Sequence, residues 1–149
     1  MGGLVRTHLA IDRRWSGEVT AVGAGTARVR LATLPEMVAD ADCLVHGGFV
    51  FSLADYCAML TVNEPNVVLA SAEMEFVAPV AVGDVIEATG ALLGSEGRRH
   101  EVEVVVERLA SEEGGEEGPV VARGRFRCVV TKRHVLRPKE SDRGGEGEP

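Results

Sequence analysis

The alternation of apolar and polar positions predicts strands in six segments of the chain. Residues 18–22 and 27–31 alternate as half-buried strands do, and the glycines at 23 and 25 between them are typical of a tight hairpin. Later in the chain, β-type patterns lie at residues 67–77, 84–93, 99–109 and 120–131. The segment 94–97 separates two of these strands and has the length of a hairpin turn.

One long helix is predicted between the second and third strands. Residues 47–63 are apolar on nearly every side, which is typical of a helix enclosed by other elements. Asn63 and Pro65 end it, because proline cannot continue the helical ladder. Strands with one segregated helix indicate an α+β fold in which an antiparallel sheet is wrapped around a long central apolar helix.

The sequence predicts a single domain over residues 1–136. Residues 1–15 show no firm period and are expected to form an arm or a short helix. The acidic run 111–118 is expected to be a solvated hairpin tip. Residues 137–149 are charged and rich in glycine, so a disordered tail is expected there.

The distribution of charged residues restricts the classes of molecule that the protein is expected to bind. The net charge of the 149 residues is −7, and most of the excess lies in the acidic run and the tail. The remaining body is nearly neutral, which argues against the extended basic face that nucleic acid binding requires. No apolar run reaches the roughly 18 residues that a membrane span needs, and the first residues lack the pattern of a secretory signal.

The cysteines and histidines favour a reduced compartment and no metal site. Three cysteines without a CxxC pair make a disulfide framework unlikely and predict a soluble, cytoplasmic protein. The four histidines are scattered without the spacing of metal ligands, so no metal is expected.

Asp55 is the first candidate for chemistry, since it is the one charge inside the apolar helix. A buried carboxylate costs several kcal/mol unless it is paired, hydrogen-bonded or held at an interface. Two interpretations stay open: a structural aspartate bonded to neighbouring backbone, or a catalytic carboxylate with a perturbed pKa.

The segment His46, Gly47 and Gly48 at the start of the same helix is the second candidate. Helix N-termini present free N–H groups, and glycines allow a substrate to approach the backbone closely. An oxyanion or a polarised carbonyl fits such a place. The alternative is that the two glycines merely permit a tight turn into the helix.

The spacing of the two candidates favours a site shared between two chains. Eight residues separate Gly47 from Asp55, or about 12 Å along a helix axis. Both groups would have to lie within about 3 to 4 Å of one reacting carbonyl. Two antiparallel copies of the helix satisfy this condition, so a homodimer is predicted, and the strand edges of the sheet favour self-association as well.

The segment Val45–Asp55, VHGGFVFSLAD, strongly resembles the helix-start motif of hotdog-fold acyl-CoA thioesterases, in particular the phenylacetate-pathway type. Glu75–Pro79, the Gly-Asp turn at 83–84 and the turn at 97–99 resemble later parts of the same family in the same order. The resemblance covers roughly residues 17–133. It implies hydrolysis of an acyl-CoA thioester to the free acid and coenzyme A, with no cofactor apart from the substrate's own coenzyme A.

The resemblance also implies residue roles. The Gly47 N–H would polarise the thioester carbonyl, and Asp55 of the opposing subunit would act as nucleophile or as general base. His46 would orient the turn or contact the substrate, and Gly48 would allow the substrate to approach. A dimer is implied, with a tetramer or hexamer as its possible assemblies.

Other positions depart from the family pattern or leave alternatives. Asp40 stands where relatives often have Asn, and Leu69 where they often have Ser or Thr. Ser71, two residues on, is expected on the same strand face as Leu69 and is the weak substitute for the missing hydroxyl. Arg98 and Arg99 are predicted either to meet the phosphates of coenzyme A or to form a solvated hairpin tip.

Two further functions on the same fold stay as alternatives. One is a non-catalytic protein that binds or senses an acyl-CoA in the same groove. The other is a hydratase or dehydratase; such relatives generally use a different catalytic pair, and the Ala54-Asp55 pattern fits the thioesterase branch better.

Overall fold

The structure is a computed structural model that describes residues 3–109 and 117–137. Most of the predicted acidic tip at 111–118 and of the predicted tail at 137–149 lies outside the described residues, so these two expectations stay predictions.

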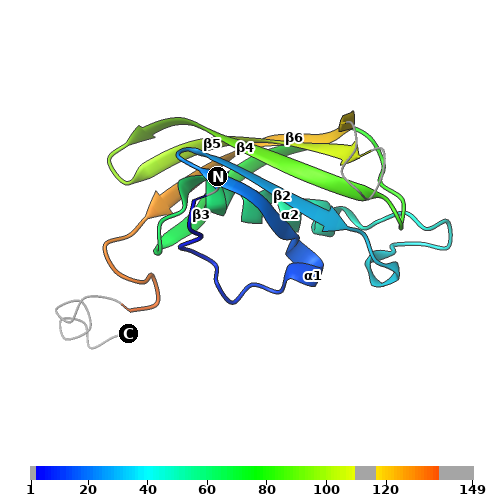
Figure 1. Ribbon diagram of the computed structural model, residues 1–149, viewed down its shortest axis with the longest axis horizontal. Helices are drawn as coiled ribbons and strands as arrows, with labels where there is room; N and C mark the ends of the chain where they lie inside the picture. Colours follow the sequence, from blue (N-terminus) through cyan, green and yellow to red (C-terminus); the bar gives the residue numbers. More distant parts are fainter. Residues whose placement is uncertain (1–2, 110–116, 138–149) are drawn as a thin grey trace.

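The chain forms its elements in the predicted order (Figure 1). A four-residue helix and a short 3-10 turn are added to the long helix and six strands that the sequence predicts. The bounds are α1 Arg13–Ser16, β1 Glu18–Gly23, β2 Thr26–Ala32, η1 Pro35–Met37, α2 Gly47–Val62, β3 Val67–Phe76, β4 Val85–Glu96, β5 Arg99–Leu109 and β6 Glu117–Val130.

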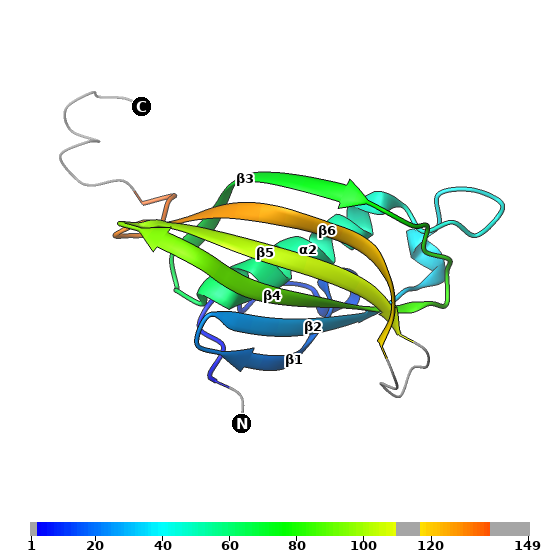
Figure 2. The ribbon, with the colours of Figure 1, turned by 90° about the horizontal axis from the view of Figure 1, so that it is seen from above.

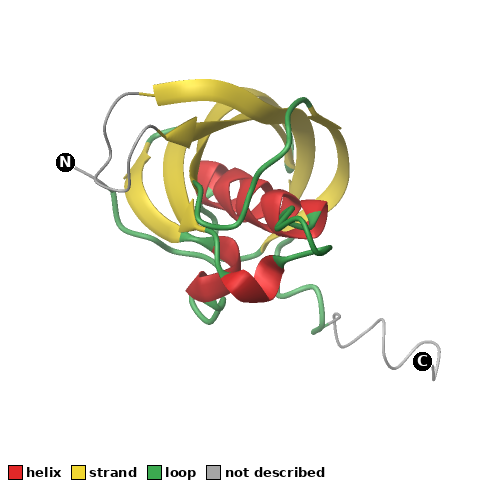
Figure 3. Cartoon of the chain, turned by 90° about the vertical axis from the view of Figure 1, so that its right-hand side faces the viewer, coloured by secondary structure: helices red, strands yellow, loops and turns green. Residues whose placement is uncertain are grey.

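The six strands form one antiparallel sheet in the order β1-β2-β4-β5-β6-β3. Figure 2 shows these strands side by side across α2, and Figure 3 shows the sheet curved around that helix. The predicted α+β architecture, with an antiparallel sheet wrapped around one long central helix, is confirmed.

Helix α2 is enclosed because the sheet turns its apolar side chains toward it. Val29, Ile86 and Val104, from three different strands, are fully buried in the same core as the helix. At Gly90 of β4, an added Cβ would lie 2.2 Å from the Thr61 hydroxyl oxygen. The missing side chain therefore sets how closely β4 approaches α2.

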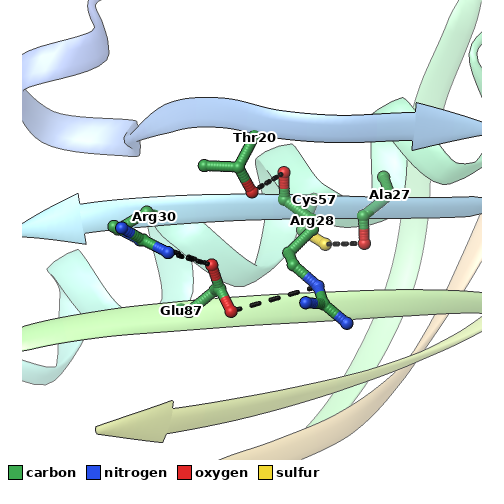
Figure 4. A network of polar contacts seen from close by, with 6 residues as sticks. All are labelled: Thr20, Ala27, Arg28, Arg30, Cys57 and Glu87. Atoms are coloured by element: carbon green, nitrogen blue, oxygen red, sulfur yellow. Dashed lines mark hydrogen bonds and ion pairs between the residues drawn. The ribbon is translucent and has the colours of Figure 1, made fainter. Parts of the chain in front are cut away.

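A buried carboxylate on the outer face of the sheet has a structural explanation. Glu87 alternates with inward-facing Ile86 and Ala88 and is only 3% exposed. The Arg30 Nη2 donates to Glu87 at 3.1 Å, and the Arg28 Nε lies 3.9 Å from its other oxygen (Figure 4). Because two guanidinium groups neutralise this carboxylate, it needs no catalytic role to account for its burial.

The turn between β4 and β5 differs from the prediction. The strands continue to Glu96 and start again at Arg99, which face each other across the ladder. The chain therefore reverses at Gly97 and Arg98, with Gly97 at φ 63° as a two-residue hairpin requires. The glycine at 94 stands inside a strand, next to a bulge at Leu93, rather than in the turn.

Strand β3 forms an edge of the sheet and exposes much of its length. Residues 70–73 and 75–77 are exposed, among them Phe76 at 55% and Val77 at 49%. Within the described residues no strand pairs with its outer side. Such an edge presents unpaired backbone groups that can pair with another chain.

Candidate active site

The start of α2 is fixed by backbone bonds to two neighbouring segments. Val45 donates its N–H to Val80 O at 2.8 Å, and His46 donates to Met37 O at 2.9 Å. His46 then takes an extended conformation as the N-cap, and Gly47 and Gly48 are the first helical residues. In the described part of the chain, neither glycine N–H has a hydrogen-bond acceptor, as expected at a helix N-terminus.

The two glycines differ in what the chain itself demands of them. A Cβ on Gly48 would lie 3.0 Å from the His46 Nε2, so the glycine makes room for that ring. A Cβ on Gly47 would meet the Phe76 ring at 3.7 Å, an ordinary van der Waals contact. Packing within one chain therefore explains Gly48 and leaves Gly47 without a steric reason.

His46 itself lies on the surface beside these glycines. Its ring meets the edge of the Phe49 ring, with centroids 6.1 Å apart, and its side chain makes no capping bond to the helix. Its position suits a group that shapes the turn or meets a ligand there.

A hollow of about 240 Å³ opens at the helix start. It lies between Gly47 and Val50 of α2 and the segment that follows β3, from Phe76 to Val80. Its walls are apolar apart from backbone groups.

Asp55 lies at the middle of α2 and has an unsatisfied carboxylate oxygen. Its Oδ1 is buried and has no hydrogen-bond partner among the described residues. Burial raises the pKa of this carboxyl group from 3.8 to about 6. Within the described residues, no bond to neighbouring backbone satisfies this oxygen, and a raised pKa is what the catalytic interpretation of Asp55 expects. The catalytic role itself stays a prediction.

Asp55 opens into a second hollow, of about 380 Å³. Its walls come from Met59 of α2, from Val67–Leu69 at the start of β3, and from two segments near the chain ends that include His8 and His134. Leu69, which stands where relatives often have Ser or Thr, therefore lines the same hollow as Asp55.

The single chain does not bring its two candidates together. No residue lines both hollows, and α2 keeps Gly47 and Asp55 eight residues, about 12 Å, apart. The Asp55 hollow lies at the first residues of β3, and the Gly47 hollow at its last. The two hollows thus lie at opposite ends of the same exposed edge strand.

The structure corrects the placement of Ser71. Leu69 faces buried Cys128 across the ladder, but Ser71 faces exposed Arg127, because a bulge at Ala70 shifts the register. The expectation that Ser71 shares a face with Leu69 is therefore wrong. Ser71 lies on the outer face, away from Asp55, and lines a third hollow of about 610 Å³.

Asp40 is occupied by its own loop. Its Oδ1 accepts hydrogen bonds from the N–H groups of Asp42 at 3.0 Å and Leu44 at 3.1 Å. It lines neither the Asp55 hollow nor the Gly47 hollow. The aspartate therefore folds the loop that leads to His46, and its contact with a substrate stays a prediction.

The two arginines lie at the β4–β5 hairpin. Arg98 is in the turn, and Arg99 lines the same 610 Å³ hollow as Ser71 and Arg127. Neither Arg99 nor Arg127 has an ion-pair partner within the described ranges. Their contact with phosphates stays a prediction.

No sequence pattern pointed to His8 and His134 as walls of the Asp55 hollow. Both come from segments without apolar period, and the fold places both in the lining of this hollow. In the residues that the structure covers, no group of three His, Cys, Asp or Glu is placed to hold a metal ion. Nor does any helix there have the length and apolar character to cross a membrane.

Comparison with known proteins identifies the family. A model described as the thioesterase superfamily matches residues 44–114. The crystal structure of an uncharacterized protein, PH1136 from Pyrococcus horikoshii, is 44% identical, covers 92% of this chain and 99% of that one, and has a TM-score of 0.84. The chain belongs to the thioesterase superfamily. The hotdog fold that the helix-start motif implies is confirmed.

More distant structures share the fold of this superfamily member. PaaI of E. coli, from the phenylacetic acid degradation operon, is 19% identical with a TM-score of 0.69, covering 80% of this chain and 83% of its own. The Streptococcus mutans protein smu.793, solved with acetyl CoA bound, is 18% identical with a TM-score of 0.70, covering 86% and 99%.

One curated protein of similar sequence is named as an isomerase and not as a thioesterase. The methylthioribose-1-phosphate isomerase of Aquifex aeolicus is 48% identical over 98 residues, which are 66% of this chain. This chain spans only 22% of the length of that protein.

Proposed function

We propose that the protein hydrolyses an acyl-CoA thioester at a site shared between two copies of the chain. The observation that carries the proposal is the buried, unpartnered carboxylate of Asp55 in the central helix. Membership of the thioesterase superfamily and an acetyl-CoA complex of a protein with the same fold support the substrate class.

Asp55 can act in either of two ways. Its oxygen attacks the thioester carbonyl carbon, or it takes a proton from a water molecule that attacks that carbon. In both cases the C–S bond breaks, the electron pair leaves with sulfur, and the carbonyl oxygen carries negative charge at the tetrahedral stage. With a pKa near 6, Asp55 is largely ionised at neutral pH, as either role requires.

The free N–H of Gly47 is the proposed donor to that carbonyl oxygen. It lies at the N-terminus of a sixteen-residue helix, where the dipole also favours negative charge. The open space beside Gly47 allows a substrate to reach the backbone there. His46 is proposed to shape this turn, and Gly48 keeps space for the His46 ring.

The position of the two hollows on β3 supports a shared site. If two β3 edges pair in antiparallel fashion, the start of one strand lies beside the end of the other. That arrangement brings the Asp55 hollow of one chain next to the Gly47 hollow of its partner. The proposed dimer thus follows from an exposed edge and from the distance between the two groups on one helix.

The nucleotide part of the substrate extends beyond these hollows. Arg98 and Arg99 are proposed to meet its phosphates; Arg99 lines the 610 Å³ hollow together with Arg127, and Arg98 lies in the adjoining turn.

The first experiment measures thiol release from a panel of acyl-CoA esters. Asp55→Asn is nearly isosteric and removes the charge, so kcat is expected to fall by about 10²-fold or more. Asp42→Asn is the matched control, because Asp42 is exposed and its carboxylate has no role in the site. Binding of acyl-CoA without release of thiol by the wild type would instead support the non-catalytic alternative.

The second experiment tests the sharing of the site. Gly47→Pro removes the donor N–H, and His46 already has the extended ψ of 133° that a residue before proline needs. Asp55→Asn and Gly47→Pro parents are expected to be inactive, whereas their heterodimer has one site with both groups intact. Gly47→Ala keeps the N–H and serves as control. Two folded, inactive parents whose isolated heterodimer is also inactive would refute the shared site.

A further inference from the structure

The segment before α1 is fastened across the end of the central helix. Asn63, the left-handed C-cap of α2, donates from Nδ2 to Leu4 O at 2.8 Å and accepts from the Arg6 N–H at 2.8 Å. The Arg6 guanidinium also lies 3.9 Å from the Glu64 carboxylate. These contacts hold the next residues, Thr7 and His8, over the C-terminal half of α2.

The backbone of His8 is in a conformation that side-chain-bearing residues seldom adopt. Its φ is 55°, in the left-handed region, which costs a non-glycine residue on the order of 1 kcal/mol or more. The conformation is retained where the surrounding fold imposes it. Here it places the imidazole in the wall of the Asp55 hollow and 6.4 Å from the Tyr56 ring, centroid to centroid.

One ring nitrogen of His8 is already engaged. Its Nδ1 lies 2.9 Å from the hydroxyl oxygen of Thr7, a side chain in a residue that is only 3% exposed. The contact holds the ring and leaves Nε2 as the nitrogen available to a molecule in the hollow. Burial lowers the pKa of the His8 ring, so the imidazole is neutral at neutral pH and able to accept a proton.

The second histidine of the hollow offers different chemistry. The Nδ1 of His134 accepts a hydrogen bond from the Leu136 N–H at 3.0 Å. In the neutral ring the proton therefore sits on Nε2, which makes that nitrogen a donor. Of the two histidines, His8 can adopt either tautomer, because the Thr7 hydroxyl can either donate to its Nδ1 or accept from it.

We propose that His8 is a further catalytic residue, the base that cleaves an acyl-Asp55 intermediate. This rests on the proposed function, with Asp55 as the nucleophile. Asp55 attacks the thioester, forms an acid anhydride and releases the coenzyme A thiolate. His8 Nε2 then takes a proton from water while the water oxygen attacks the acyl carbon of the anhydride. The bond from that carbon to the Asp55 oxygen breaks, which regenerates the carboxylate and frees the acid, and the imidazolium returns its proton to solvent.

The test is the time course of thiol release at enzyme concentrations high enough to see one turnover. His8→Asn suits it, because asparagine tolerates the left-handed backbone and keeps an amide for Thr7 but cannot accept the proton. We expect a burst of about one thiol per site followed by a steady rate at least about 10²-fold below wild type. Acid quenching during the slow phase should leave the acyl group on the peptide that contains Asp55, detected by mass spectrometry.

Two further variants separate the outcomes. His134→Asn is expected to give no burst, and Asp55→Asn neither burst nor turnover. A His8→Asn enzyme with a steady rate near wild type, or with both phases lost while it remains folded by circular dichroism, would overturn the role of His8. So would a burst in His134→Asn instead. If wild type released no thiol from any acyl-CoA, the proposed function itself would fail, which is a distinct result.

Should His8→Asn disturb the arm, Thr7→Val provides a second route. It keeps the shape of the side chain and removes only the hydroxyl that holds the ring. We expect a burst of smaller amplitude than in His8→Asn and a second phase slower than the steady rate of wild type. A time course identical to that of wild type would contradict the proposal.

Discussion

Replacing Asp55 with asparagine is expected to stabilise the fold while lowering kcat by about 10²-fold or more. Burial raises the pKa of this carboxyl group from 3.8 to about 6, so ionising it in the folded chain is harder than in the unfolded chain. At 1.36 kcal/mol per pKa unit, the difference amounts to about 3 kcal/mol at neutral pH. The value is an upper one, since part of the side chain remains in contact with solvent.

The stabilisation should depend on pH with a defined sign. Because the folded pKa is the higher one, the native state holds a proton that the unfolded chain loses between pH 3.8 and about 6. The wild type therefore loses stability across that window, whereas Asp55→Asn does not. The difference between the two should be close to zero at pH 3.5 and reach its full value above pH 7. For a chain of this size, about 3 kcal/mol corresponds to a rise in Tm of about 6 to 12 °C.

Urea denaturation of both proteins at a series of pH values measures this difference. Protein concentration is held constant, because a dimer's stability depends on it. Asp42→Asn again serves as the control and should show no comparable window. If Asp55→Asn were less stable than wild type at pH 7, the Oδ1 would have a stabilising partner in the folded protein, and the reasoning from an unpartnered carboxylate would be refuted.

Two predictions concern glycines. Gly90→Ala places a Cβ 2.2 Å from the Thr61 hydroxyl oxygen and should lower the free energy of unfolding by about 1 to 3 kcal/mol; urea denaturation equal to that of wild type would contradict the close approach. Gly48→Ala must displace the His46 ring, whose Nε2 would be 3.0 Å from the new Cβ, whereas Gly47→Ala meets no such contact. Thermal unfolding should therefore show a lower Tm for Gly48→Ala than for Gly47→Ala, and equal values would argue against this packing.

The architecture was predictable because each helix and strand has a recognisable pattern within a short segment of the sequence. A helix apolar on all sides can only be the enclosed one, and Val29 or Ile86 fall on the inner face by simple alternation. The candidate residues Gly47 and Asp55 could be singled out for the same reason. A single carboxylate in an apolar helix and a pair of glycines at its start are departures from the apolar helical pattern, and they are visible within a short segment of the sequence.

What the sequence did not reveal depended on strand register, on hydrogen bonds within loops or on contacts between distant segments. The segment around Ser71 is built of small and apolar residues on both faces, so the bulge at Ala70 leaves no mark in the alternation. The Asp40 carboxylate is consumed by two N–H groups of its own loop, which composition does not reveal. His8 lines the Asp55 hollow in a segment that Asn63, more than fifty residues later, holds through hydrogen bonds to Arg6 and Leu4.

Three features of the single chain either lower its stability or have no explanation in the packing of one chain. The proposed pairing of two β3 strands would account for all three. Within the described residues, the Asp55 Oδ1 is buried without a partner, the side of Gly47 is left open, and β3 is an exposed edge strand. Natural proteins normally lack such features unless function requires them, because each feature lowers stability or promotes aggregation. In the proposed dimer, antiparallel pairing of β3 with a second copy would cover the edge and bring the open side of Gly47 toward the Asp55 carboxylate of the partner. The thioester carbonyl would then lie between the nucleophile or base of one chain and the N–H donor of the other.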